Sequence, residues 1–459
     1  MKVRISLALA GWLVCGTAAA ETGSTGRFEF GSYGRVTTTS DGRGRTGRDS
    51  NIVAHGSRID APSYAELEFR REDQYSGGAT SRVVATLALF PPFFHFSGKP
   101  QQQFGVRNLY ATGSYGFFNI WAGSRMYRGD DIYLLSWWPL DNQNTVGGGF
   151  GFSIPSSIGN THIAAQAGML RLDSPNTYQS IPSVSPIGFG AISAISLDRP
   201  HTIESLKVTH TLTRSHIASL PERGGLKFIA YGELHQLAAG VKRDASLNYE
   251  SSLPEDAGWM AGAEVGYWTG ERDSHVSLFV RHARGLAAYD PLGVPTTFGN
   301  RHTTAGAHET LVALGANYEI GMFGVLFGGY ARMFRDASPS FTSSEKFNEG
   351  NVVVRPQLYI AENWGLAIEG SYQARQTAYA AQNGRPGVAA LVRGAIFPYF
   401  SPSGRGSFKR PQIGVIYAVS ARNAAARELY AQDDVFAHRT FEHFVGVTAE
   451  WWFNSSTYP

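Results

Sequence analysis

The sequence of 459 residues has one cysteine, Cys15, near its start, so a chain processed after residue 20 has none. This excludes disulfide bonds, thiolate metal sites and a cysteine nucleophile. The 13 histidines are scattered along the chain. His275 and His282, the nearest approach to a ligand pair, would point to opposite faces of a strand. We therefore expect no metal site and no cofactor.

Catalytic and nucleotide-binding motifs are missing as well. The chain has no HExxH, GxSxG, GxxxxGK(S/T) or CxxC segment. The triple glycine at residues 147–149 is followed by neither a helical period nor an acidic ribose partner, so it does not open a dinucleotide-binding helix. We expect no catalytic residue and a protein that is not an enzyme, with an enzyme built on a barrel as a minor alternative.

An excess of either charge is also lacking. Without Lys2 and Arg4, the 40 lysines and arginines become 38, against 37 aspartates and glutamates. A nucleic-acid-binding domain would show a basic surface. We expect no nucleic-acid partner.

Beyond the N-terminus the chain has no long apolar run. A membrane-spanning helix needs about 20 nearly continuous apolar residues, and the nearest candidate, residues 83–96, is interrupted by Pro91 and Pro92. In lipid every backbone polar group must be paired within the protein, so a closed barrel is the membrane fold that is left. The 53 glycines, the 13% aromatic content and a mean hydropathy of -0.18 favour one large β unit.

The N-terminus has the order of a secretory signal peptide. Lys2 and Arg4 precede an apolar run at residues 5–15, and the three alanines at residues 18–20 form a cleavage site. This pattern predicts removal of residues 1–20 and export into a bacterial envelope. Residues 21–459 then form the barrel.

Apolar and polar residues alternate along the rest of the chain. The period is clear in five segments: residues 28–36, 63–70, 274–282, 366–375 and 443–453. Segments of about ten alternating residues with aromatic residues at their ends are typical of transmembrane strands. We predict an all-β protein, a transmembrane antiparallel β-barrel of 18 strands, with long loops at residues 37–49, 173–185, 289–308 and 377–387. A soluble β-sandwich also alternates and is the alternative.

The same alternation sorts side chains between lipid and lumen. If Phe28, Leu67 and Val445 face lipid, the lumen receives Tyr33, Arg35, Tyr64, Glu66 and Trp452. Large rings in an aqueous lumen suit a solute with one apolar and one polar side, such as a pyranose. Arginine and carboxylate groups can replace water on its hydroxyls, because charge-assisted hydrogen bonds are strong.

Residues 119–152 begin like a strand and then carry both signs of charge and paired tryptophans. With FEFGSYGR, SRIDAPSYAEL, RPQLY, KRPQIGVIYA and AEWWF elsewhere, the segment IWAGSRMYRGDDI resembles the maltoporins, trimeric 18-stranded sugar-selective porins of Gram-negative outer membranes. In that family the loop after IWAG folds inward and narrows the pore. The resemblance implies an inward-folded constriction loop, a homotrimer, contact with outer-membrane lipid and saccharides as solutes.

The resemblance also assigns residues. Tyr33, Tyr64 and Trp452 fall on the family's aromatic slide, and Trp138 falls on the aromatic that closes the constriction. Arg128 is next to Gly129, where the family has a basic residue, and can replace it. The polar track beside the slide is then Arg35, Arg58, Glu66, Arg107, Arg128 and Asp131.

Some positions depart from the family. Ser136 stands where the family loop has an acid, and Pro139 replaces a second tyrosine. A tryptophan pair expected shortly before Arg355 is absent, with Phe347 as the available stand-in. Two functions therefore remain open. One is facilitated diffusion of maltodextrin-like or other sugars, and the other is a general or differently selective diffusion porin on the same scaffold.

Overall fold

The computed structural model describes residues 24–90, 103–170, 178–184, 191–197, 199–244, 249–270, 273–289, 303–337, 346–380 and 386–455. The predicted signal peptide and parts of the predicted loops at residues 173–185, 289–308 and 377–387 lie outside the described residues.

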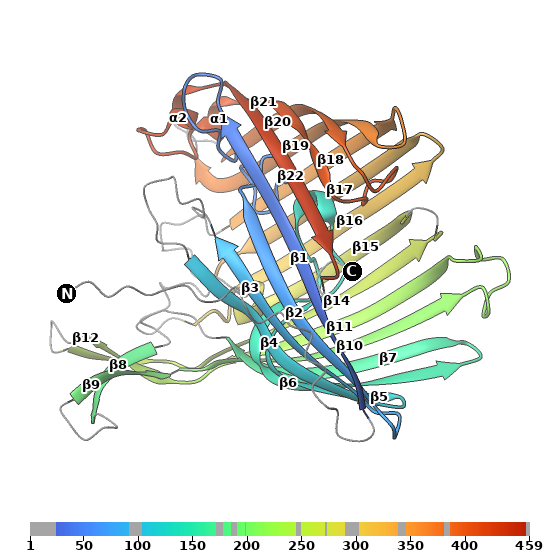
Figure 1. The fold of residues 1–459 in the computed structure, drawn as a ribbon. Coiled ribbons are helices and arrows are strands. Elements are labelled where there is room, and N and C mark those ends of the chain that lie inside the picture. Colours follow the sequence, from blue (N-terminus) through green and yellow to red (C-terminus); the bar gives the residue numbers. More distant parts are fainter. Residues whose placement is uncertain are drawn as a thin grey trace, which may run out of the picture.

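Eighteen strands form one closed antiparallel sheet (Figure 1). They are β1 (Ser24–Ser40), β2 (Tyr64–Tyr75), β3 (Thr80–Phe90), β4 (Gln103–Tyr115), β5 (Phe118–Arg128), β6 (Asn142–Ser156), β7 (Gly159–Leu170), β10 (His201–Thr213), β11 (Gly225–Leu237), β14 (Asp256–Trp268), β15 (His275–Gly285), β16 (His308–Ile320), β17 (Phe323–Arg335), β18 (Lys346–Tyr359), β19 (Trp364–Ala380), β20 (Pro386–Phe400), β21 (Gln412–Arg422) and β22 (Phe441–Phe453).

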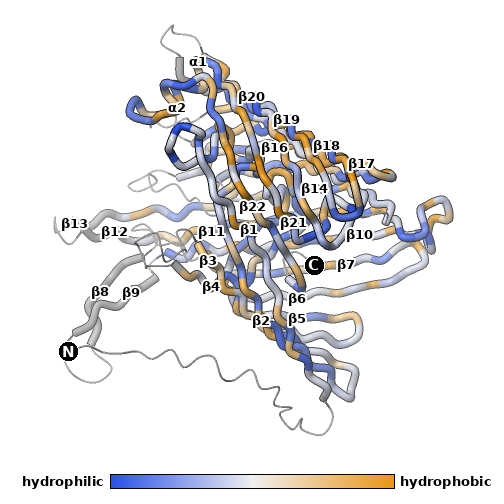
Figure 2. Tube along the Cα trace, turned by 45° about the horizontal axis from the view of Figure 1, so that its top comes forward, coloured by the Kyte–Doolittle hydropathy of each residue, from blue (hydrophilic) through white to orange (hydrophobic). Residues whose placement is uncertain are grey.

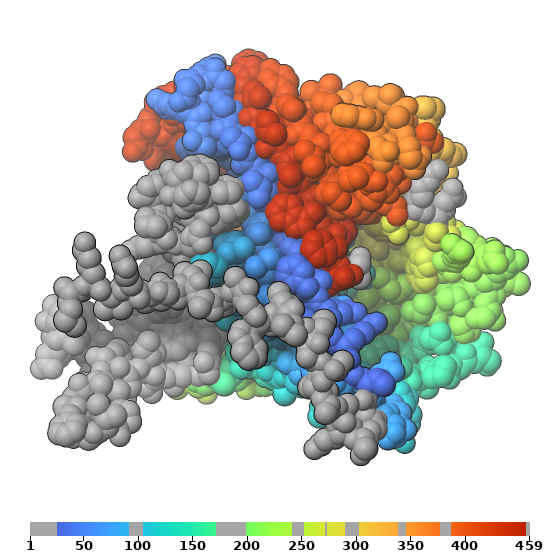
Figure 3. Space-filling model, in the orientation of Figure 1, coloured from blue at the N-terminus to red at the C-terminus, as the bar shows by residue number. Residues whose placement is uncertain are grey.

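The barrel is closed by its first and last strands. β1 pairs with β2 on one side and with β22 on the other, where Tyr33 lies opposite Trp452. Figure 3 shows the blue first strand directly beside the red last strand. Closure leaves the sheet without an open edge, as a strand protein in lipid requires. The predicted fold class and strand number are confirmed.

The two ends of the barrel have different connections. Short turns lie at the end where β1 begins and β22 ends, and Gly116 and Gly321 in two of them have φ of 57° and 55°, a backbone that glycine adopts freely. The opposite end carries the longer connections. These include the hairpins β8–β9 (Tyr178–Val184, Ala191–Leu197) and β12–β13 (Gly240–Asp244, Tyr249–Leu253) and the helices α1 (Ala424–Arg427) and α2 (Val435–His438). None of the described helices is long and apolar enough to cross a bilayer.

The strands turn apolar side chains outward and polar ones inward. Phe28 is 61% exposed and Val447 is 60% exposed, whereas Glu66 is 2% exposed in the lumen. Orange and blue segments recur along the strands in Figure 2 because successive side chains point to opposite faces. The alternation predicted from the sequence is confirmed in these strands.

The largest cluster of buried apolar residues lies inside the barrel. It joins Ile52 from the loop after β1 and Ile132, Leu134 and Trp137 from the loop after β5 to wall residues such as Phe279. The lumen is therefore narrowed by buried apolar residues of the two loops.

Candidate pore constriction

Residues 129–141, which connect β5 and β6, are named the inward loop. The backbone N–H of Gly129 donates to the carbonyl of Asp141 at 3.1 Å and closes its neck. The backbone N–H of Ile132 donates to the carbonyl of Trp137 at 2.8 Å, around one 3-10 turn at Tyr133–Leu135. These bonds give the loop a fixed shape.

The inward loop reaches the wall on the other side of the lumen. A Cβ atom at Gly315 of β16 would lie 3.2 Å from Ile132, and one at Gly328 of β17 would lie 2.9 Å from it. The missing side chains at these two glycines make room for Ile132, which is 1% exposed. The loop therefore lies across the lumen.

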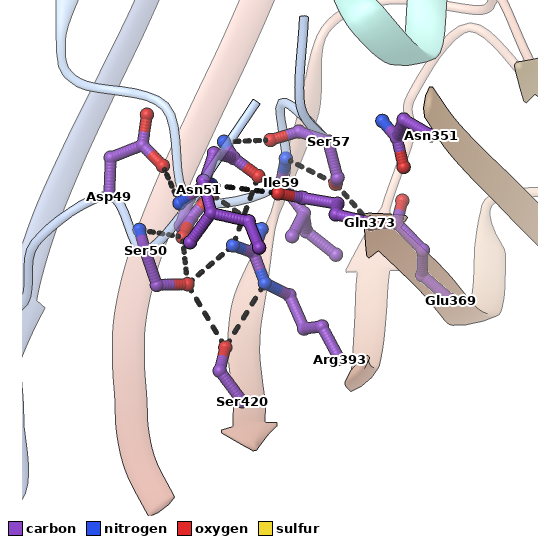
Figure 4. A network of polar contacts seen from close by, with 12 residues as sticks. Asp49, Ser50, Asn51, Ser57, Ile59, Asn351, Glu369, Gln373, Arg393 and Ser420 are labelled. Carbon is purple, nitrogen blue, oxygen red and sulfur yellow. Dashed lines mark hydrogen bonds and ion pairs between the residues drawn. The ribbon is translucent and has the colours of Figure 1, made fainter. Parts of the chain in front are cut away.

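Residues 41–63, the connection between β1 and β2, also turn inward and are named the first loop. Its polar groups bind to the wall, where Arg393 of β20 donates to Asp60 at 2.8 Å and to Ser420 at 3.2 Å. Figure 4 shows Arg393 in contact with Ser420 and with Ser50 of the loop. Ser57 of the loop donates to Glu369 of β19. A buried network with this many partners holds the first loop in one place.

The two loops contact each other inside the barrel. The backbone N–H of Arg58 donates to the carbonyl of Leu134 at 3.0 Å. The ring of His55 stacks on Trp137 with centroids 4.0 Å apart and an interplanar angle of 11°. Burial lowers the pKa of His55 to about 3, so the stacked imidazole is neutral at physiological pH.

A row of aromatic rings runs along the lumen wall beside the inward loop. Tyr33 lies 6.1 Å from Tyr64 and 6.5 Å from Trp452, centroid to centroid. Trp452 lies 6.1 Å from Tyr133 of the inward loop, and Tyr133 lies 5.4 Å from Phe408. We name these five rings the aromatic row. The structure brings together the predicted slide residues Tyr33, Tyr64 and Trp452.

One carboxylate, that of Glu450 on β22, organises the charges beside the aromatic row. It pairs with Arg58 of the first loop, and with Arg410 at 2.8 Å. It also accepts a hydrogen bond from the hydroxyl of Tyr133 at 2.7 Å. Each guanidinium stacks on a ring: Arg58 lies 4.3 Å from the Tyr133 centroid, and Arg410 lies 4.0 Å from that of Trp452. Two cations around one buried anion, each hydrogen-bonded, offset its loss of water.

The other end of the row has a second charge group. Arg107 pairs with Glu66 at 2.8 Å, and the hydroxyl of Tyr64 donates to Glu66 at 2.5 Å. Arg35 donates to the carbonyl of Pro62 at 2.9 Å and lines the same small space as Arg58 and Glu450. Of the predicted polar track, Arg35, Arg58, Glu66 and Arg107 therefore flank the row.

Three predicted residues lie elsewhere in the constriction. The guanidinium of Arg128 covers the ring of Trp138 at 3.8 Å and donates to Asn142 at 2.7 Å. The structure brings these two together, but apart from the aromatic row. Asp131 has a buried Oδ2 without a hydrogen-bond partner among the described residues. Burial raises the pKa of its carboxyl to about 6.

Several residues of the site were not predicted. Tyr133 and Phe408 complete the aromatic row, and Glu450 and Arg410 hold its charges. Glu450 alternates with Trp452 on the lumen side of β22, a signal that could have found it. Phe347, the predicted stand-in, instead stacks on Phe334 at 5.1 Å.

Little space is left between the loops and the row. A cavity of about 40 Å³ remains among Arg35, Arg58, Tyr133, Arg355 and Glu450. One water molecule in the liquid takes about 30 Å³. The space among these residues is far smaller than the roughly 300–1,000 Å³ of a typical small-molecule site. Among the described residues, no cluster of His, Cys, Asp or Glu has the arrangement of a metal site.

Three solved outer-membrane proteins are among those to which this chain is similar at low sequence identity. OmpT of Vibrio cholerae has a TM-score of 0.39 and 10% identity, over 95% of this chain and 99% of that chain. The outer membrane channel DcaP of Acinetobacter baumannii has a TM-score of 0.39 and 12% identity, over 95% and 99%. OpdK of Pseudomonas aeruginosa, in a structure with vanillate, has a TM-score of 0.41 and 8% identity, over 93% and 98%. No curated protein sequence matches the chain.

Family membership rests on a different comparison. The model of the LamB porin family matches residues 28–453, from the first strand to the end of the last. The match spans every strand of the barrel and the inward loop. The chain belongs to the LamB porin family and is a porin of the Gram-negative outer membrane.

Proposed function

We propose that this porin passes saccharides by facilitated diffusion along the aromatic row. The observation that carries the proposal is the row itself, five rings from Tyr64 to Phe408 with charged groups on their flank. A lumen that only water passes does not need such rings. A pyranose does, because its C–H face can pack on a ring plane while its hydroxyls exchange water for charged partners.

The charged groups beside the row can pair with sugar hydroxyls, which both donate and accept hydrogen bonds. The carboxylates of Glu66 and Glu450 accept hydrogen bonds, and the guanidiniums of Arg58 and Arg107 donate them. Ring contacts and hydrogen-bonding groups are repeated along the row, so a solute can exchange one set for the next. A solute can therefore enter and leave, as conduction requires.

A second function is favoured by the small space at the constriction. The charges at Glu450 are already paired with one another, and about 40 Å³ is left among them. A general or differently selective diffusion porin, which passes ions and small solutes, would need no more.

The proposal includes the remaining expectations from the sequence. Residues 1–20 are a signal peptide, the porin is a homotrimer in contact with outer-membrane lipid, and it catalyses no reaction. Trp138, Arg128 and Asp131 belong to the constriction with Arg35. Maltodextrin-like oligosaccharides or another saccharide are the solutes.

Liposome swelling tests the proposal. Vesicles that contain the purified porin are diluted into isosmotic solutions of a disaccharide and of a zwitterionic non-sugar of similar mass. Faster swelling in the disaccharide is expected. Equal rates that follow solute size alone would support the general porin instead.

A further inference from the structure

A separate cavity lies in the lumen near the end of the barrel that carries the short turns. Its volume is about 690 Å³, and it is lined by residues of the first five strands, among them Arg27, Glu72, Arg82, Asn119 and Arg125. Cavities of about 300–1,000 Å³ are typical of small-molecule sites. No residue of the aromatic row lines it.

Arg125 of β5 has an unusual surrounding in this cavity. Its guanidinium carbon lies 4.8 Å from the ring centroid of Tyr110, 5.2 Å from that of Trp121 and 5.3 Å from that of Tyr127. Tyr110 and Trp121 are themselves buried, at 8% and 5% exposure. The rings hold the guanidinium in place and keep water from its faces, while its N–H edge can still donate.

The other charged residues of the cavity are paired. Glu72 pairs with Arg27 and with Arg82, at 2.8 Å and 2.7 Å. Asp73, which also lines the cavity, pairs with Arg71 at 2.7 Å. No ion pair or hydrogen bond of the Arg125 side chain is found within the described part of the chain, where its guanidinium contacts three rings and no carboxylate.

We propose that this cavity binds the carboxylate of an acidic sugar, a pyranose that carries a carboxyl group, with Arg125 as its anchor. A planar guanidinium matches a carboxylate with two parallel hydrogen bonds, which are strong where water is excluded. Thr112 and Asn119 line the same space and offer polar groups to the sugar hydroxyls. The sugar part of the ligand rests on the proposed function, whereas the carboxylate part rests on Arg125.

The cavity lies on the side of the constriction where a solute would leave towards the periplasm, because the short turns of outer-membrane barrels face that compartment. A neutral sugar would pass it with little delay. An acidic sugar would be held there after passing the constriction, which makes the cavity a second subsite in series with the aromatic row.

Block of ion current in planar bilayers tests the proposal with galacturonate and galactose, which differ in the carboxylate. Arg125→Gln is expected to weaken block by galacturonate by about tenfold or more, the effect of losing a hydrogen bond to a charged group. Block by galactose should not change. Arg125→Lys keeps the charge but not the planar pairing, so its block by galacturonate should lie between those of the wild type and Arg125→Gln.

Arg82→Gln is the matched control, because it removes a cation of the same cavity that already has a carboxylate partner. Its galacturonate block should stay within about twofold of the wild type, as expected for an exposed ion pair. Equal losses in both variants would show a general field effect and overturn the proposal, as would an unchanged Arg125→Gln. If galacturonate blocks the wild type and galactose does not, the carboxylate site at Arg125 is supported and binding of neutral sugars by the aromatic row is contradicted. If galactose blocks the wild type and galacturonate does not block it more strongly, only the carboxylate site is contradicted.

Discussion

The hydroxyl of Tyr133, on the inward loop, donates a hydrogen bond to the carboxylate of Glu450, on the last strand, at 2.7 Å. The two residues are 317 positions apart in the chain. Their contact joins the loop that narrows the lumen to the wall that carries the aromatic row. Arg410 binds both, so the turn between β20 and β21 takes part as well.

Removal of the Tyr133 ring should widen the pore. Tyr133→Ala deletes the side chain between Phe408 and Trp452 and is expected to raise single-channel conductance severalfold, because the ring lies between these two and lines a cavity of only about 40 Å³. Tyr133→Phe keeps the ring and loses the hydroxyl, so its conductance should stay close to the wild type. A conductance that is the same in all three proteins would place the constriction elsewhere.

Neutralising Glu450 should destabilise the barrel. Glu450→Gln leaves Arg58 and Arg410 buried without their carboxylate, which costs about 3–5 kcal/mol for a broken buried pair. Urea unfolding in detergent micelles measures the change. Glu442→Gln on the same strand is the control, because its partner Arg439 is more exposed and the loss should be below about 1 kcal/mol. Similar losses in both variants would contradict the buried role of Glu450.

The ion selectivity of the pore should change with pH near 6. Burial raises the pKa of the Asp131 carboxyl to about 6, so the group is neutral below that pH and negative above it. Cation selectivity, measured as a reversal potential in a salt gradient, should therefore rise between pH 5 and pH 7. Asp60 of the first loop has a pKa raised to about 6 by burial as well. Asp131→Asn should thus remove a part of the rise in cation selectivity between pH 5 and pH 7. A rise of unchanged size in this variant would show that other groups cause it.

The two predicted tryptophans should differ in their effect on sugar. Trp452 lies in the aromatic row, and Trp138 lies under Arg128 outside it. Loss of about 60 Å² of apolar contact weakens binding by about 1.5 kcal/mol, or about tenfold in Kd. Trp452→Ala should show this loss in current block by a sugar, and Trp138→Ala a smaller one with the barrel still folded. A larger effect of Trp138→Ala would contradict this order and show that Trp138 makes the main contact with the sugar.

The strands and their lumen faces could be predicted because the β period is local. Phe28 and Val447 point outward and Glu66 points inward for the same reason, the twofold alternation of side chains along a strand. The resemblance to maltoporins added Arg58, which lies in a loop where alternation says nothing.

The loop contacts could not be predicted because they depend on the direction in which a loop packs. Tyr133 and Phe408 have no period that places them, and their rings meet only after two connections from opposite ends of the barrel enter the lumen. The place of Ile132 depends on two distant glycines, Gly315 and Gly328, whose role is visible only once the wall is built.

The central claim is that the aromatic row binds sugar inside an open channel. The most direct measurement is the current through the purified porin in a planar bilayer, titrated with maltooligosaccharides and then with sucrose, in the wild type and in Trp452→Ala. We predict block that rises with sugar concentration and is about tenfold weaker in the variant. A stable channel that no sugar blocks would contradict the claim and leave a general diffusion porin on the same barrel.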